Sequence, residues 1–86
     1  MIKIWGKLIT EGKIIKQATI SVDPHTTTFF DMLKNLSQEL HIPTPVLLDK
    51  HAYDFNVFHL CTFKPDDFVE SVLFDRFELS LLAEHK

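Results

Sequence analysis

The sequence predicts a single α+β domain over residues 1–86. In it, an N-terminal β-hairpin is packed by one main helix, a short second helix follows, and a C-terminal strand completes a mixed sheet. Three observations favour this: alternating apolar residues near both ends of the chain, a helical Phe/Leu stripe between them, and little glycine or proline. A chain of 86 residues can bury one core but has no mass for a second lobe.

Period-two alternation predicts two strands, over residues 1–9 and 14–22. A tight two-residue turn at Glu11-Gly12 would suit the glycine. The strand register that follows from such a turn, however, would put apolar and polar residues on the same face of the hairpin. An odd-length loop instead pairs Ile4 with Ile20 and Gly6 with Ala18. Because burial usually fixes register, we predict the second pairing, with the even positions facing the core.

A helix is predicted from Thr28 to His41. The Thr28 hydroxyl can accept the backbone N–H of Asp31, and the apolar residues then follow at helical spacing: Phe29, Leu33, Leu36 and Leu40. This helix should cover the hairpin. We expect Phe29 or Leu33 to fill the notch that Gly6 leaves in the sheet.

The segment from Val46 to Phe58 fits both helix and strand. We predict a short strand or extended stretch over residues 46–48, then a helix from about Asp49 to Phe58. Residues 65–68 begin with proline and two acids, which is typical of a single helical turn. Alternation over residues 76–81 predicts the final strand.

This order of elements resembles the β-grasp, or ubiquitin-like, domains, mainly over residues 1–42 and the last strand. The chain ends with residues 83–86, Ala-Glu-His-Lys, where ubiquitin-like modifiers and sulfur carriers have Gly-Gly, which argues against conjugation chemistry. The segments Phe63–Glu70 and Phe74–Glu78 are similar to short uncharacterised bacterial proteins, a resemblance that implies no assigned function.

Composition predicts a cytoplasmic protein. Cys61 is the only cysteine, so no intramolecular disulfide forms, and no apolar run suggests a signal peptide or a membrane partner. Residues 1–22 carry four lysines and one acid, Glu11, whereas the remainder of the chain is acidic. The net charge of the whole chain is −3. The basic hairpin either packs against the acidic remainder or attracts an anionic partner.

Possible metal ligands gather in the middle of the chain, at Asp49, His51, Asp54, His59 and Cys61. Their spacing matches no standard site, so we predict no metal and no cofactor. If a metal binds, His51, Asp54 and His59 are the candidates. The simpler interpretation is that the histidines lie exposed on a helix.

Two other groups have structural explanations. Apolar neighbours on both sides of Cys61 should bury its thiol and raise its pKa, which disfavours a nucleophile. The adjacent carboxylates Asp66 and Asp67 are explained by the start of a helical turn.

We predict a non-enzymatic protein-interaction module, because no catalytic set converges in the sequence. A protein partner or a second copy, giving a homodimer, would contact the outer face of the hairpin or add a strand along Met1–Ile9. The expected contact residues are Lys3, Trp5, Lys7, Ile9, Ile15, Gln17 and Thr19.

Two alternatives stay open. One is a metal-dependent or thiol enzyme that uses His51, His59 and Cys61. The other is a single-stranded nucleic-acid binder on Lys3, Trp5 and Lys7, where the ring could stack on a base. The acidic balance and the single arginine argue against nucleic acid.

Overall fold

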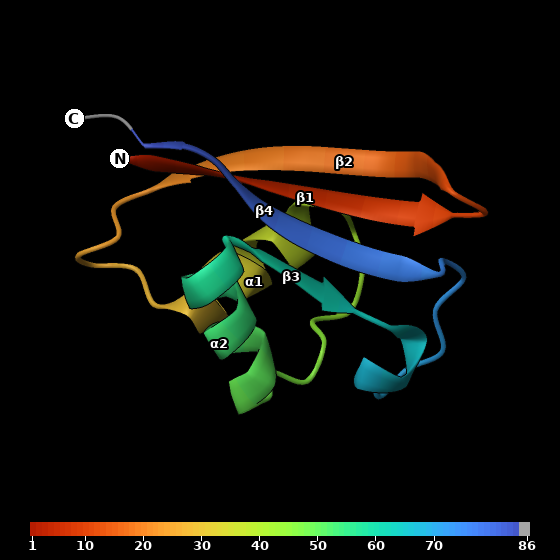
Figure 1. Ribbon diagram of the computed structural model, residues 1–86. Coiled ribbons are helices and arrows are strands. Elements are labelled where there is room, and N and C mark those ends of the chain that lie inside the picture. Colours follow the sequence, from red (N-terminus) through yellow and green to blue (C-terminus); the bar gives the residue numbers. More distant parts are fainter. Residues whose placement is uncertain (85–86) are drawn as a thin grey trace.

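The computed structural model describes residues 1–84, and the tail residues His85 and Lys86 lie outside the described part. The four strands form one sheet in the order β2-β1-β4-β3, and both helices lie on the same side of it (Figure 1). The predicted α+β class is confirmed. In chain order the elements are β1 (Ile2–Thr10), β2 (Lys13–Val22), α1 (Phe29–Glu39), α2 (Asp49–Phe58), β3 (Leu60–Phe63), the 3₁₀ turn η1 (Pro65–Asp67) and β4 (Arg76–Glu84).

Every neighbouring pair of strands is antiparallel, so the expectation of a mixed sheet is wrong. The reason is β3, a strand that the sequence analysis did not predict. The chain leaves β3, passes through η1 and reaches the tip of the hairpin, where the Asp75 N–H donates to the Ile9 carbonyl at 2.8 Å. From there β4 runs opposite to β1 and to β3. The order of elements remains loosely consistent with a β-grasp-like arrangement.

The predicted register of the hairpin is confirmed, with Ile4 opposite Ile20 and Gly6 opposite Ala18. The even face of β1 is therefore buried: Ile4 is 0% exposed.

The hairpin turn nevertheless has two residues, Glu11 and Gly12, with φ angles of 52° and 77°. Next to the turn Ile9 pairs with Ile14, and the pairing then skips Ile15. This β-bulge supplies the extra residue that restores the core-facing parity farther along the strands. The tight turn and the apolar register therefore occur together.

Helix α1 begins where the sequence predicted. The Thr28 hydroxyl accepts the Asp31 N–H at 3.1 Å. At the other end, the Lys16 ammonium donates to the Leu40 carbonyl at 2.8 Å, which suits the negative end of a helix dipole. One lysine of the basic hairpin is thus used to hold α1.

Leu36 packs against Gly6, in the place where Phe29 or Leu33 was expected. A Cβ atom at Gly6 would lie 3.0 Å from Leu36 Cδ2 and 3.2 Å from Phe77 Cε1. Phe29 instead contacts Phe55 of α2, with 5.1 Å between the ring centroids, and so joins the two helices.

Helix α2 has the predicted bounds. Residues 46–48 form no strand, although the Val46 N–H donates to the Asp67 carbonyl at 2.7 Å. His59 ends the helix in a left-handed conformation, φ 58°, and reverses the chain into β3. Among residues 1–84 no helix is long and apolar enough to cross a membrane.

The close approach at Gly6 gives a testable prediction. Gly6→Val should lower the free energy of unfolding by about 1–3 kcal/mol, because the added methyl groups overpack Leu36 and Phe77. Urea denaturation measures this. A companion variant, Ser21→Val, adds similar bulk at an exposed position of β2 and should change stability little. Equal stability of Gly6→Val and the wild type would contradict the packing described here.

Candidate functional site

The outer face of the sheet, turned away from both helices, is the first candidate site (Figure 1). Lys3, Trp5 and Lys7 of β1 lie on it, because the intervening Ile4 and Leu8 point into the core. Gln17 and Thr19 lie across from Lys7 and Trp5 on β2. Five of the seven predicted contact residues therefore share this face.

Trp5 is half-buried and held by polar contacts. Its indole Nε1–H donates to Gln17 Oε1 at 2.9 Å, and the Lys7 ammonium lies 4.2 Å from the ring centroid. Lys7 is also 3.3 Å from Glu78 Oε2, and Arg76 donates to Glu78 Oε1 at 2.8 Å. Burial raises the pKa of Glu78, but hydrogen bonds from Arg76 and Lys7 outweigh it and hold the pKa below its usual range.

An exposed leucine lies on the same face as the tryptophan. Ser80 pairs with Trp5 on one side and with Leu60 on the other, so a small residue separates two apolar side chains. Leu60 is 42% exposed. Leu82 is 50% exposed, but it lies at the irregularity of β4 where the pairing skips from Leu81 to Ala83. We call Trp5, Leu60 and Ser80 the outer apolar patch.

Two of the predicted contact residues lie elsewhere than expected. Ile9 is only 5% exposed, because it lies between its sheet partners Ile14 and Arg76, and it is not available for contact. Ile15 is 57% exposed, but it lies at the bulge. Strand addition along Met1–Ile9 is also wrong, since β1 is an interior strand with β2 and β4 on its two sides.

The histidines of the predicted metal group do not converge. His51 is 2% exposed near the start of α2, whereas His59 is exposed beyond its end. Asp54 lies between them in the chain. Among the side chains that the structure describes, no three from His, Cys, Asp and Glu are placed to hold one metal ion. The expectation of exposed histidines is wrong for His51.

His51 joins three segments from within the core. Its Nδ1 accepts the Leu48 N–H at 3.1 Å, so the neutral ring carries its proton on Nε2. That nitrogen lies 3.5 Å from Asp67 Oδ2, which is long for a hydrogen bond. The ring also packs on Phe63, with 4.1 Å between centroids. Burial lowers the pKa of His51, and it outweighs the attraction of Asp67.

Cys61 has the predicted structural environment. Its side chain is 2% exposed, and burial, followed by the nearby Asp54 carboxylate, raises the pKa of the thiol to about 12. The helix-start role of the adjacent acids also fits, because Asp67 Oδ2 accepts the Lys64 N–H at 2.9 Å.

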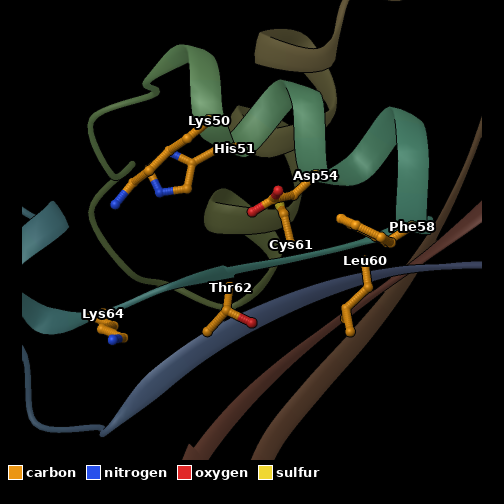
Figure 2. A pocket seen from close by; sticks show the side chains of 8 residues that line it. All are labelled: Lys50, His51, Asp54, Phe58, Leu60, Cys61, Thr62 and Lys64. Carbon is orange, nitrogen blue, oxygen red and sulfur yellow. The ribbon is translucent and has the colours of Figure 1, made fainter.

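A groove of about 400 Å³ runs between α2 and the edge strand β3. Figure 2 shows lysines at one end of this α2–β3 groove, aromatic and aliphatic side chains at the other, and Asp54 and Cys61 between them. This groove was not expected from the sequence, because β3 was not predicted. The helix contributes Lys50, His51, Asp54 and Phe58 to the groove, and the strand side contributes Leu60, Cys61, Thr62 and Lys64.

No family model matches this chain. Comparison with the curated proteins and with the solved structures likewise gives no match. Function must therefore be argued from the sheet face, the buried histidine and the groove.

The buried His51 predicts how stability depends on pH. Its pKa in the folded chain lies below the ordinary 6.5, so the unfolded chain binds the proton more readily. The contribution of His51 to the free energy of unfolding is therefore complete above about pH 6.5, and it is lost as the pH falls toward the folded-state pKa. Urea denaturation between pH 8 and pH 5 should show this decline, and His51→Gln should flatten it.

His25→Gln is the matched control, because His25 is exposed. It should leave the pH profile of the wild type intact. A profile unchanged by His51→Gln would contradict the account of this residue.

Proposed function

We propose that this chain is a non-enzymatic interaction module that pairs with a second copy of itself through the outer face of the sheet. One observation carries the proposal: both helices lie on one side of the sheet (Figure 1), so the opposite face keeps a positioned, half-buried tryptophan that no helix among residues 1–84 covers. The solvent face of an antiparallel sheet is ordinarily polar. An aromatic centre beside an exposed leucine is instead typical of the middle of a protein interface.

The polar contacts around Trp5 support this role. Gln17 and Lys7 already fix the ring in one position, so little side-chain entropy is lost when a partner covers it. Lys7 and Arg76 both pair with Glu78, which offsets one of the positive charges on the face, while Lys3 stays exposed. A second copy would therefore meet an apolar centre with a basic surround.

The area of the face also suits a dimer. Three of its strands have nine or ten residues. With about 3.3 Å per residue and about 4.8 Å between strands, these three strands cover about 30 by 14 Å. The four residues of β3 add about 13 by 5 Å. Side-chain relief raises this flat area toward the roughly 800 Å² per partner that a standard interface buries.

The alternatives have less support. For nucleic acid, the Lys7 ammonium already lies over the Trp5 ring and pairs with Glu78, which leaves fewer groups for a base and its phosphates. For an enzyme, His51 and His59 are eight residues apart, about 12 Å along a helix axis, and the Cys61 thiol is held protonated. The sheet face remains the better-supported site.

Light scattering tests the dimer. The mass of the wild type should rise with concentration toward twice that of the monomer, and Trp5→Glu should hold the chain at the monomer mass. A charge in the centre of a dry interface is costly, so Trp5→Glu should raise the dissociation constant of the dimer at least tenfold. Circular dichroism should show that Trp5→Glu remains folded, since Trp5 lies outside the core.

Tyr53→Glu is the matched control. It places the same charge on an aromatic position of α2 that is 62% exposed, away from the sheet face, and it should dimerise like the wild type. A wild type that stays monomeric at all concentrations, or a dimer that Trp5→Glu leaves intact, would sink the proposal.

A further inference from the structure

Strand β3 has an unpaired edge. It lies at the end of the sheet, with β4 on one side and no strand on the other among residues 1–84. The Leu81 N–H donates to the His59 carbonyl at 3.0 Å, which makes these two residues a hydrogen-bonded pair. Hydrogen-bonded and non-hydrogen-bonded pairs alternate along antiparallel strands. The next residues of β3 whose backbone groups bond to β4 are therefore Cys61 and Phe63. The backbone N–H and C=O of Leu60 and Thr62 consequently point toward the open edge.

Helix α2 forms a wall beside that edge. Lys50, Asp54 and Phe58 are spaced four residues apart, so they form one stripe along the helix, and all three line the α2–β3 groove (Figure 2). Four residues of helix rise about 6.0 Å, and two residues of strand rise about 6.6 Å. An extended chain placed beside β3 would therefore present every second side chain to one member of the stripe.

The stripe changes chemistry along its length. Phe58 is 67% exposed at one end, Asp54 lies in the middle, and Lys50 lies at the other end with Lys64 nearby (Figure 2). A complementary segment would carry an apolar side chain opposite Phe58, a basic one opposite Asp54 and an acidic one opposite the lysines. Charge complementarity of this kind selects both sequence and direction.

We propose that the α2–β3 groove binds an extended peptide segment of a partner protein, which adds to β3 as a fifth strand. Antiparallel addition is favoured because antiparallel pairing is the more stable per residue. The segment then has, from its N-terminus, the pattern acidic–x–basic–x–apolar. Main-chain hydrogen bonds to Leu60 and Thr62 supply affinity, and the stripe on α2 supplies specificity. This surface meets the outer apolar patch at Leu60, which belongs to both, but α2 and the open edge of β3 lie outside that patch.

Two synthetic peptides of identical composition test the pattern. One contains Glu-Thr-Lys-Thr-Phe, and the other contains Lys-Thr-Glu-Thr-Phe, in which the charges are exchanged. Fluorescence anisotropy with labelled peptides should show that the first binds at least tenfold more tightly, because the second places like charges against Asp54 and Lys50. Equal affinities for the two peptides, or no binding of the first, would overturn the proposal.

A charge reversal on the protein sharpens the test. Asp54→Lys should weaken binding of the first peptide at least tenfold and improve binding of the second. Asp66→Lys makes the same change at an exposed position outside the groove and should alter neither affinity. Identical effects from both variants would mean that net charge, and not the groove, governs binding.

The backbone contact is tested at Thr62. Thr62→Pro removes an N–H that points away from β4, a position that an edge strand tolerates, and it should abolish binding of the first peptide. Thr62→Val keeps the N–H and should bind the peptide as the wild type does. A peptide that binds Thr62→Pro with unchanged affinity would overturn strand addition.

The test also separates a second copy of the chain as the occupant. If β3 pairs with β3 of another copy, Thr62→Pro should break a dimer that Trp5→Glu leaves intact. That result would overturn both the peptide proposal and the proposed dimer face. Peptide binding that survives Trp5→Glu supports the groove independently of the sheet face.

Discussion

The contact between Leu36 of α1 and the bare backbone of Gly6 is the constraint on which the rest of the structure depends. Glycine lets the helix come this close without a shift, since a Cβ atom there would lie 3.0 Å from Leu36 Cδ2 and would force that side chain to move. The contact places α1 against the centre of β1, and the even face of the hairpin becomes the core. The register of the hairpin must then keep that parity, which the bulge at Ile15 achieves beside a two-residue turn.

From this one-sided core the two candidate surfaces follow. Both helices lie on the same side, and no helix or strand among residues 1–84 covers the other face. The outer face therefore keeps Trp5, and the hydrogen bond to Gln17 together with the Lys7 ammonium over the ring positions it without burying it fully. On the covered side, α2 reverses tightly through His59 into β3 and leaves the α2–β3 groove along the sheet edge.

Local features were predictable from the sequence because local rules decide them. The alternation in the hairpin, the Thr28 cap and the bounds of α2 follow from periodicity and capping, and the burial of Cys61 follows from its apolar neighbours. Features that depend on distant partners were missed. β3 has only four residues, too few for a clear alternation, and its pairing requires β4. Ile9 is buried in the sheet beside Arg76, a strand partner that lies far away in the sequence.

The site was predictable in the same measure. Placing Lys3, Trp5 and Lys7 on one face needed only strand geometry, and that placement agrees with the structure. The order of the strands could not be obtained in this way, so β1 was expected at an edge when it lies inside the sheet. The burial of His51 depends on its packing against Phe63 of the strand that was missed. The groove was missed for the same reason.

The central claim is that the uncovered sheet face is where this chain meets its partner, and Trp5 reports on it directly because it is the only tryptophan. The measurement is its fluorescence emission and its quenching by iodide across a concentration series. If a second copy covers the face, the emission should shift to shorter wavelength and the quenching should fall as concentration rises. Emission and quenching that stay constant while the chain is shown to dimerise would contradict the claim.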